Sequence, residues 1–149
     1  MSITAYQEQV FYHYILSNQI FLSTTKPEFF TNANIKELFE IAKVHALKYK
    51  EPPSKDQMIQ LVQLQGLTEK YPDDLVTTLY NAKNLLTQYG DNWLEDNVGP
   101  WIQVRNLDNV MRKAIAFMKT TSVTAENANE VVEKIRHMLS YETAIDFSF

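Results

Sequence analysis

The longest amphipathic stretch of the chain lies between residues 93 and 141 and predicts two helices separated by a short break at residues 120–123. At ~100° per residue, the apolar side chains of the first helix cover roughly half of its circumference. The second helix, expected to start near Thr124, has one apolar stripe about 120° wide. One stripe can join the two helices as a hairpin. The rest of the wider face needs another partner, either the N-terminal part of this chain or a second copy.

Eight apolar side chains are expected to form the seam of this hairpin and its contact with a partner hairpin. They are Val104, Met111, Ile115, Met118, Val131, Ile135, Met138 and Leu139. Burying such a side chain is worth ~1.5–3 kcal/mol before entropic costs, so a handful could support a specific dimer. Four basic residues should lie at the rim, where charge sets register or partner choice. They are Arg105, Arg112, Lys113 and Arg136.

Shorter amphipathic stretches predict a helical lobe over residues 1–90. The connector at 18–30 is so rich in apolar residues that it should lie over the core. Gly90 and Asp91 then separate this lobe from a hairpin domain at 91–141, and residues 142–149 follow as a linker or tail. Two helices expected in the lobe cover residues 3–17 and 34–50. Two further helices are expected to end at Gly66 and near Tyr89.

Capping residues and prolines place several helix ends. Thr31 or Asn32 can cap the helix at 34–50, and Ser54, which follows two prolines, is a good N-cap for the next helix. Inside the long helix, the pair at 99–100 (GP) should cause a kink or an interruption, because proline removes a backbone hydrogen bond and clashes with the preceding turn.

Composition narrows the fold class to all-α, with a globular helical lobe followed by a long helical hairpin. The 149 residues are 45% hydrophobic and 21% charged, and contain only three glycines and five prolines. So few helix breakers among long stretches of Leu, Ile, Glu, Lys and Gln favour helices throughout.

Charge and sequence content argue against several classes of protein. A net charge of −4 gives no basic face, so direct nucleic-acid binding by this chain is not expected. The chain has no cysteine, which removes disulfides and thiolate chemistry and agrees with a reducing cytosol. Its N-terminus does not resemble a signal peptide, and no run is long and apolar enough for a membrane span.

Candidate catalytic and metal-binding groups are few, and no catalytic residue, cofactor or metal site is predicted. The three histidines, His13, His45 and His137, lie on different predicted helices. A zinc site could combine His45 with Glu37 or Glu40, but a surface or half-buried histidine is the simpler interpretation. No glycine-rich loop precedes a Lys-Ser or Lys-Thr pair, as nucleotide hydrolysis of the P-loop kind requires.

Other polar and aromatic residues also have simpler structural roles. Asp73 and Asp74 could act as an acid–base pair, but aspartates are favoured at helix N-termini for capping and dipole reasons. Trp93 and Trp101 could stack on bases, but too little positive charge surrounds them and packing is favoured. The methionines of the predicted hairpin fit either an adaptable binding groove or core filler.

Residues 8–16 (EQVFYHYIL) begin a series of motifs that continues with an acidic-aromatic turn at 28–30 (EFF), an apolar pattern at 38–42 (LFEIA) and a helix after 52–54 (PPS). The long helix with Arg105 and the helix after it complete the series. This order of segments resembles the N-terminal domain of DnaB-type replicative helicases, particularly the shorter phage members. In that family similar motifs precede a helical hairpin.

This resemblance implies a domain without catalytic activity. In that family the hairpin pairs with the hairpin of a neighbouring subunit, three such dimers form a collar on an ATPase ring, and primase or a helicase loader docks on the collar. The motor domain of an ATP-dependent DNA helicase would follow the tail, in the cytoplasm of a bacterial or phage-infected cell. This chain could then assemble or recruit, but could not unwind DNA.

Two alternatives come from other classes of protein. The first is a stand-alone adaptor, such as a helicase loader or phage regulatory protein, encoded by a frame that stops at Phe149. The second is a small helical enzyme that uses Asp or Glu with His13 or His45. A continuing reading frame with a P-loop would exclude the adaptor.

Overall fold

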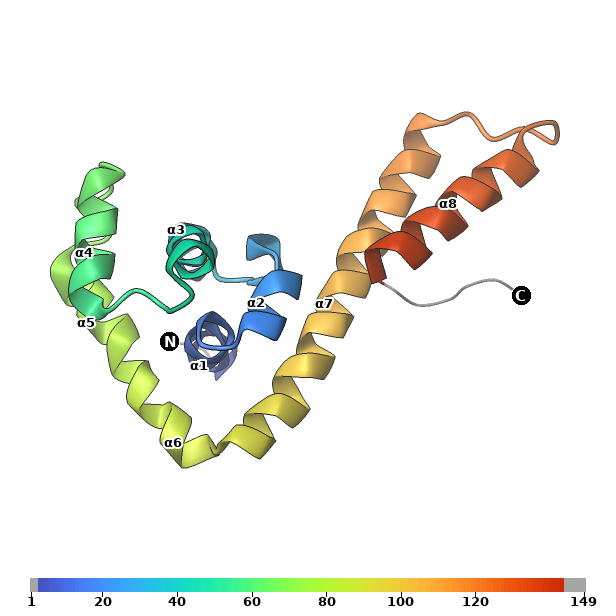
Figure 1. The fold of residues 1–149 in the computed structure, drawn as a ribbon. Coiled ribbons are helices and arrows are strands. Elements are labelled where there is room, and N and C mark those ends of the chain that lie inside the picture. The colour runs from blue at the N-terminus through green and yellow to red at the C-terminus, as the bar shows by residue number, and fades with distance from the viewer. Residues whose placement is uncertain (1–2, 144–149) are drawn as a thin grey trace. The chain divides into compact units, whose positions relative to one another are not determined.

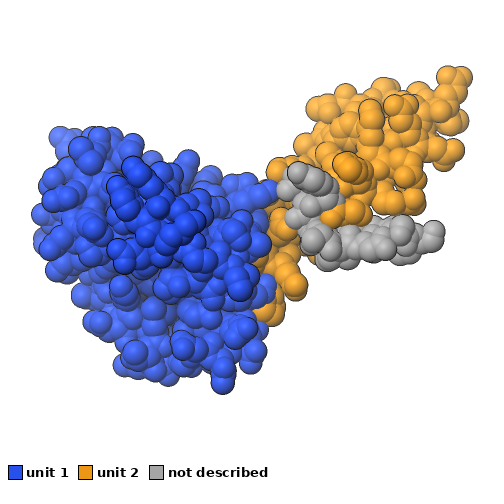
Figure 2. Space-filling model, viewed as in Figure 1, with its two compact units in different colours: residues 1–99 blue, residues 100–149 orange. Residues whose placement is uncertain are grey.

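The computed structural model describes the backbone of residues 3–143 and the side chains of residues 6–140. Throughout this part of the chain the regular structure is α-helix with two short 3-10 helices and no strand, which confirms the predicted all-α class (Figure 1). The chain divides into two compact units, residues 1–99 and residues 100–149 (Figure 2). We refer to these as the first unit and the second unit.

Residues 3–99 of the first unit form six α-helices, two 3-10 helices and the beginning of a seventh α-helix. They are α1 (Ile3–Leu16), α2 (Gln19–Thr24), η1 (Pro27–Phe29), α3 (Ala33–Tyr49), α4 (Lys55–Leu64), α5 (Asp73–Asn81), η2 (Ala82–Leu85), α6 (Leu86–Tyr89) and the start of α7 (Asp91–Thr120). The second unit contains the rest of α7 and α8 (Ala128–Thr143).

Helix α1 is the centre of the first unit. It contacts α2, α3, α6 and η2, and Phe11, Tyr12, Ile15 and Leu16 are almost completely buried. An interior helix has to be apolar around most of its circumference. Helix α1 is therefore enclosed by the rest of the first unit on most of its faces.

Two predicted N-caps are confirmed and fix the helices that follow α1. Of the two candidates before α3, Asn32 is the cap: its side chain accepts hydrogen bonds from the backbone N–H groups of Asn34 and Ile35. Ser54 caps α4 through a reciprocal pair of hydrogen bonds with Gln57, the arrangement known as a capping box. The chain entering each helix thus satisfies backbone donors that would otherwise be unpaired.

The predicted interruption of the long helix at residues 99–100 does not occur, because α7 continues through Pro100. The side chain of Pro100 is exposed, and Asp96, whose carbonyl would have accepted the missing hydrogen bond, is exposed as well. Water can therefore satisfy that carbonyl.

The first turns of α7 belong to the first unit, so the compact units divide after Gly99, whereas the sequence placed the boundary after Gly90. Leu94 and Val98 are completely buried. A Cβ atom at Gly99 would lie 3.8 Å from the ring of Phe21, which shows how closely α2 approaches α7 here. The apolar positions at the start of α7 thus complete the core of the first unit.

The second helix of the predicted hairpin starts later than expected, at Ala128 rather than near Thr124. Thr124 and Asn127 instead bond to each other before the helix: the Thr124 backbone N–H donates to the Asn127 side chain, and the Thr124 hydroxyl accepts from the Asn127 N–H. These residues form a turn before α8. The predicted tail at 142–149 begins within α8, and residues 144–149 lie outside the described part of the chain.

Helix α8 lies beside the second half of α7 (Figure 1). The Lys134 ammonium is 6.0 Å from the centre of the Phe117 ring, so side chains of the two helices meet there. A continuous hairpin seam between the two helices stays a prediction.

Candidate protein-interaction surface

Four exposed apolar side chains follow one side of α7 in the second unit. Val104, Met111, Ile115 and Met118 are exposed by 66%, 50%, 49% and 50%. Their spacing places all four within an arc of about 60° on the helix surface. We refer to these four residues as the α7 stripe.

The apolar residues of α7 that the chain covers lie on a different side of the helix. Val110 and Ala114 are buried, with exposed fractions of 0% and 7%. Their positions centre about 90° away from the α7 stripe. Helix α7 thus has one apolar side that is buried and another that is exposed. A contiguous exposed apolar surface is typical of a protein interaction site.

The eight side chains predicted for self-association fall into three groups. The four residues of the α7 stripe are exposed and accessible to a partner. Val131 on α8 is 6% exposed, which fits the interior of the unit and not its outer surface. Ile135, Met138 and Leu139 are partly buried.

Three of the four predicted rim residues already interact with a side chain in their own helix. The Arg112 guanidinium pairs with Asp108 at 2.9 Å, and Arg136 pairs with Glu133 at 2.7 Å. The Arg105 guanidinium lies 5.8 Å from the centre of the Trp101 ring. Lys113 is exposed. The Asp108–Arg112 pair flanks the α7 stripe on the side away from Val110 and Ala114.

One exposed apolar residue on α8, Val132, was not among the side chains predicted for self-association. Val132 is 50% exposed although it directly follows the buried Val131. Successive residues point about 100° apart on a helix, so a narrow seam cannot hold both. The angular offset between neighbouring positions was the signal that could have identified it.

His13 is an interior residue and not an accessible acid or base. Its Nε2 atom lies 2.7 Å from the carbonyl oxygen of Leu79, and its ring packs edge-on against the rings of Tyr12 and Tyr80 at 4.9 and 5.0 Å. Burial lowers the pKa of His13 from 6.5 to about 4, because the charged form loses its hydration. This environment favours a neutral histidine that joins α1 to α5.

The other candidate groups lie in separate parts of the first unit. His45 packs against the ring of Tyr49, and no set of three side chains able to hold a metal ion was found among the described residues. Asp73 and Asp74 occupy the first turn of α5, as expected for residues that interact with a helix N-terminus.

The tryptophans take different positions. Trp93 is 41% exposed, and its ring lies 4.9 Å from the ring of Tyr89. Trp101 is half-buried beside Arg105.

A buried carboxylate that the sequence did not single out joins α1 to the start of α3. Glu8 is 1% exposed. Its two oxygens accept hydrogen bonds from the N–H and hydroxyl groups of Thr31 and from the N–H of Asn32. Such a group needs partners to compensate for its lost hydration. Glu8 therefore has a structural role at the entry to α3.

Comparison with known proteins identified no relative of this chain. No family model matches the chain, and no curated protein and no solved structure matches it. The resemblance to the helicase domain thus stays a prediction based on the residues described above. Within the described residues, none of the helices combines the length and apolar character needed to cross a membrane.

Proposed function

We propose that this chain is a non-catalytic assembly module that pairs with a second copy through the α7 stripe. The observation that carries the proposal is the exposure of four apolar side chains along one side of α7, next to a side that is already buried. Placing two such stripes together removes apolar surface from water on both partners, which favours association.

The arrangement of the stripe favours pairing between helices. Val104, Met111 and Met118 repeat every seven residues, the period at which side chains return to the same face of paired helices. Met111 and Met118 have flexible side chains that adapt to a partner surface. The Asp108–Arg112 pair beside the stripe offers both charges to a second copy, so register can be set by charge at the edge of the contact.

The likeness of residues 8–16 and of the later segments to the N-terminal domain of DnaB-type helicases supports a more specific role. In this proposal the paired modules form a collar of up to three dimers that receives primase or a loader, in the cytoplasm. Catalysis would reside in a motor domain encoded after residue 149. A P-loop in that reading frame supports this role, and a stop after Phe149 overturns it in favour of a stand-alone adaptor.

Self-association is tested by multi-angle light scattering over a range of micromolar concentrations. The wild-type chain should change from monomer to dimer, and Ile115→Glu should remain a monomer because a carboxylate would enter the apolar contact. Ile20→Glu is the matched control, since Ile20 is 77% exposed on α2 in the first unit. It should dimerise like the wild type. A wild-type chain that stays monomeric, or equal effects of the two substitutions, would overturn the pairing.

A further inference from the structure

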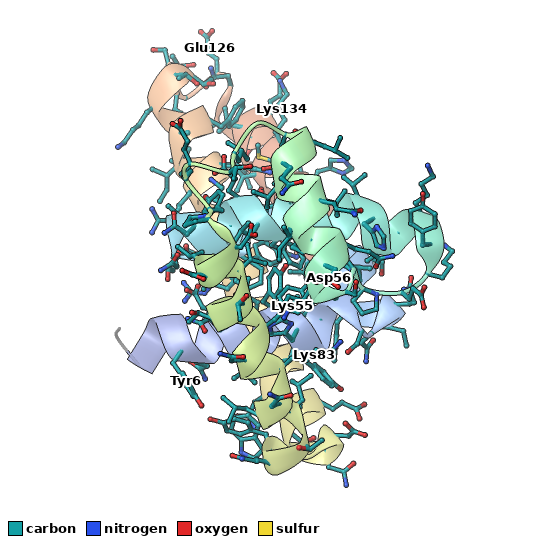
Figure 3. The ribbon with its side chains drawn as sticks, turned by 90° about the vertical axis from the view of Figure 1, so that its left-hand side faces the viewer. Tyr6, Lys55, Asp56, Lys83, Glu126 and Lys134 are labelled. Atoms are coloured by element: carbon teal, nitrogen blue, oxygen red, sulfur yellow. The ribbon has the colours of Figure 1, made fainter. Side chains whose placement is uncertain are left out.

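Among the methionines that the structure describes, the two most exposed lie in the α7 stripe. Met111 and Met118 are each exposed by 50%, whereas Met58 is completely buried in the core of the first unit. Met138 is partly buried and lines a hollow beside Lys134 of α8, which is labelled in Figure 3. The α7 stripe therefore presents two thioether groups to solvent on the surface that we expect to pair.

Thioether sulfur is the group of this chain that a two-electron oxidant attacks most readily. The sequence has five methionines and no cysteine, so no thiolate competes for the oxidant. In the reaction with a hydroperoxide, a sulfur lone pair forms the S–O bond of methionine sulfoxide and the peroxide O–O bond breaks. The second peroxide oxygen takes up the displaced proton and leaves as water or an alcohol. The sulfur loses two electrons, and the peroxide gains the same two.

Exposure decides which sulfur atoms the oxidant reaches. Met58 can react only when the core of the first unit opens, because its side chain is completely buried. Met111 and Met118 need no such opening. Since the three residues differ in access and not in chemistry, oxidation should be directed first to the α7 stripe.

Methionine sulfoxide at these two positions opposes an apolar contact between copies. Met111 and Met118 are seven residues apart, so both face the second copy in the proposed pairing. A sulfoxide oxygen buried there loses its hydrogen bonds to water. The other two side chains of the stripe, Val104 and Ile115, have no donor that could replace them. Oxidation thus makes a surface that favours association into one that favours solvent.

We propose that Met111 and Met118 are an oxidation site that controls self-association, and that their reaction with a hydroperoxide separates the paired copies. This inference rests on the proposed function, because it needs a pairing to disrupt. Pairing in turn shields the two sulfur atoms, so the monomer is the form that reacts. Reduction by two thiols reverses the step: the thiols become a disulfide, the sulfoxide oxygen leaves as water and the thioether is restored.

Peptide mass spectrometry of the full chain after treatment with hydrogen peroxide locates the reaction. In the dilute folded chain, Met111 and Met118 should gain oxygen at least about tenfold faster than Met58, which waits for the core to open. Raising the protein concentration until the chain dimerises should slow the reaction at Met111 and Met118. Equal rates at the three methionines, or rates at the stripe that ignore dimerisation, would overturn the proposal.

Light scattering of the oxidised chain tests the control of association. The dissociation constant of the dimer should rise at least about tenfold after peroxide treatment, as expected for polar groups placed in an apolar contact. Treatment with methionine sulfoxide reductase and dithiothreitol should reverse the rise. Because the chain has no cysteine, dithiothreitol has no disulfide of the chain to reduce, and recovery reports on methionine.

Two leucine variants assign the effect to the stripe, since leucine has nearly the volume of methionine and no sulfur. The double variant Met111→Leu/Met118→Leu should have the same dissociation constant before and after peroxide treatment. Met58→Leu is the matched control and should respond to peroxide like the wild type. A double variant that still responds would assign the effect to another residue and refute the inference.

Failure of this inference can be told apart from failure of the proposed function. An untreated wild-type chain that stays monomeric overturns the pairing, and the inference with it. A chain that dimerises equally well before and after oxidation of Met111 and Met118 overturns the inference alone and leaves pairing through the α7 stripe in place.

Discussion

The two units differ in how they bury apolar surface. The first unit has an interior rich in large aromatic side chains that are almost completely buried. They are Phe11, Tyr12, Phe29, Phe30, Phe39 and Tyr71. In the second unit, the buried apolar side chains among residues 100–140 are smaller and aliphatic: Ile102, Val110, Ala114 and Val131.

This difference predicts that a partner would stabilise the two units to different degrees. Large buried aromatic side chains dominate the energetics of a core. The second unit leaves the whole α7 stripe exposed, and a segment of this size is marginal without additional burial. The first unit should therefore be stable by itself, whereas the second unit should gain stability from whatever covers the stripe.

The largest expected effect tests the difference between the two cores. Phe39 is completely buried and packs against Tyr12 and Phe30. Phe39→Ala should lower the free energy of unfolding by about 3–5 kcal/mol, because the cavity cannot close fully. Phe117→Ala, at a partly buried aromatic position of the second unit, should cost less. Urea unfolding followed by circular dichroism measures both, and equal losses would remove the distinction between the units.

The second effect is a pH dependence that belongs to the first unit. His13 takes up a proton near pH 6.5 in the unfolded chain, but only near pH 4 in the folded chain. Between these values the unfolded state binds more protons, so stability falls as the pH falls. At pH 4, protonation of His13 in the unfolded chain lowers the free energy of unfolding by about 3 kcal/mol.

Substituting His13 separates its effect on the pH dependence of stability from the effect of the carboxylates. His13→Gln cannot take up the proton and can still donate to the Leu79 carbonyl, so its stability should fall less steeply between pH 6.5 and 4. Val76→Ala, a core change without a titrating group, should lower stability and leave the slope unchanged. Thermal unfolding at several pH values provides the comparison, and parallel curves for wild type and His13→Gln would refute the assignment.

The third effect concerns the polar link between α1 and α3. Glu8→Ala removes an acceptor from the N–H groups of Thr31 and Asn32 and should cost about 2–3 kcal/mol. Glu8→Gln should cost less, because one side-chain oxygen remains an acceptor. Glu40→Ala, an exposed change on α3, is the control and should have little effect. Chemical denaturation measures all three, and a loss for Glu8→Ala no larger than that for Glu40→Ala would contradict a structural role.

Local chemistry made much of this fold predictable from the sequence. The capping side chains of Asn32 and Ser54 act within a few residues, and they place the starts of α3 and α4 where the sequence put them. Apolar periodicity likewise predicted a helix over residues 3–17, where α1 lies. The continuation of α7 through Pro100 was not predicted, because it depends on whether Asp96 and Pro100 lie at the surface, which the proline alone does not reveal.

The candidate surface was less predictable because periodicity does not say which part of a wide apolar face is covered. Val104 and Val131 were both predicted to take part in self-association, yet Val104 is exposed and Val131 is buried. Both outcomes depend on packing between segments distant in the sequence.

The smallest expected effect compares one exposed ion pair from each unit. Arg112→Ala breaks the pair with Asp108 in the second unit, and Lys70→Ala breaks the pair with Glu37 in the first unit. Exposed pairs contribute little to folding, and the loss for Arg112→Ala should be about 0.3–0.5 kcal/mol. Lys70→Ala should likewise have only a minor effect on stability.

The two substitutions should differ in self-association. If Arg112 sets register beside the α7 stripe, Arg112→Ala should weaken the dimer and reduce the dependence of its dissociation constant on salt, since rim charges act through screened electrostatics. Lys70→Ala should leave both quantities unchanged because Lys70 lies in the first unit. Sedimentation equilibrium at two salt concentrations measures the difference. Identical dimerisation of the two variants would exclude Arg112 from the interface, even if the apolar stripe itself pairs.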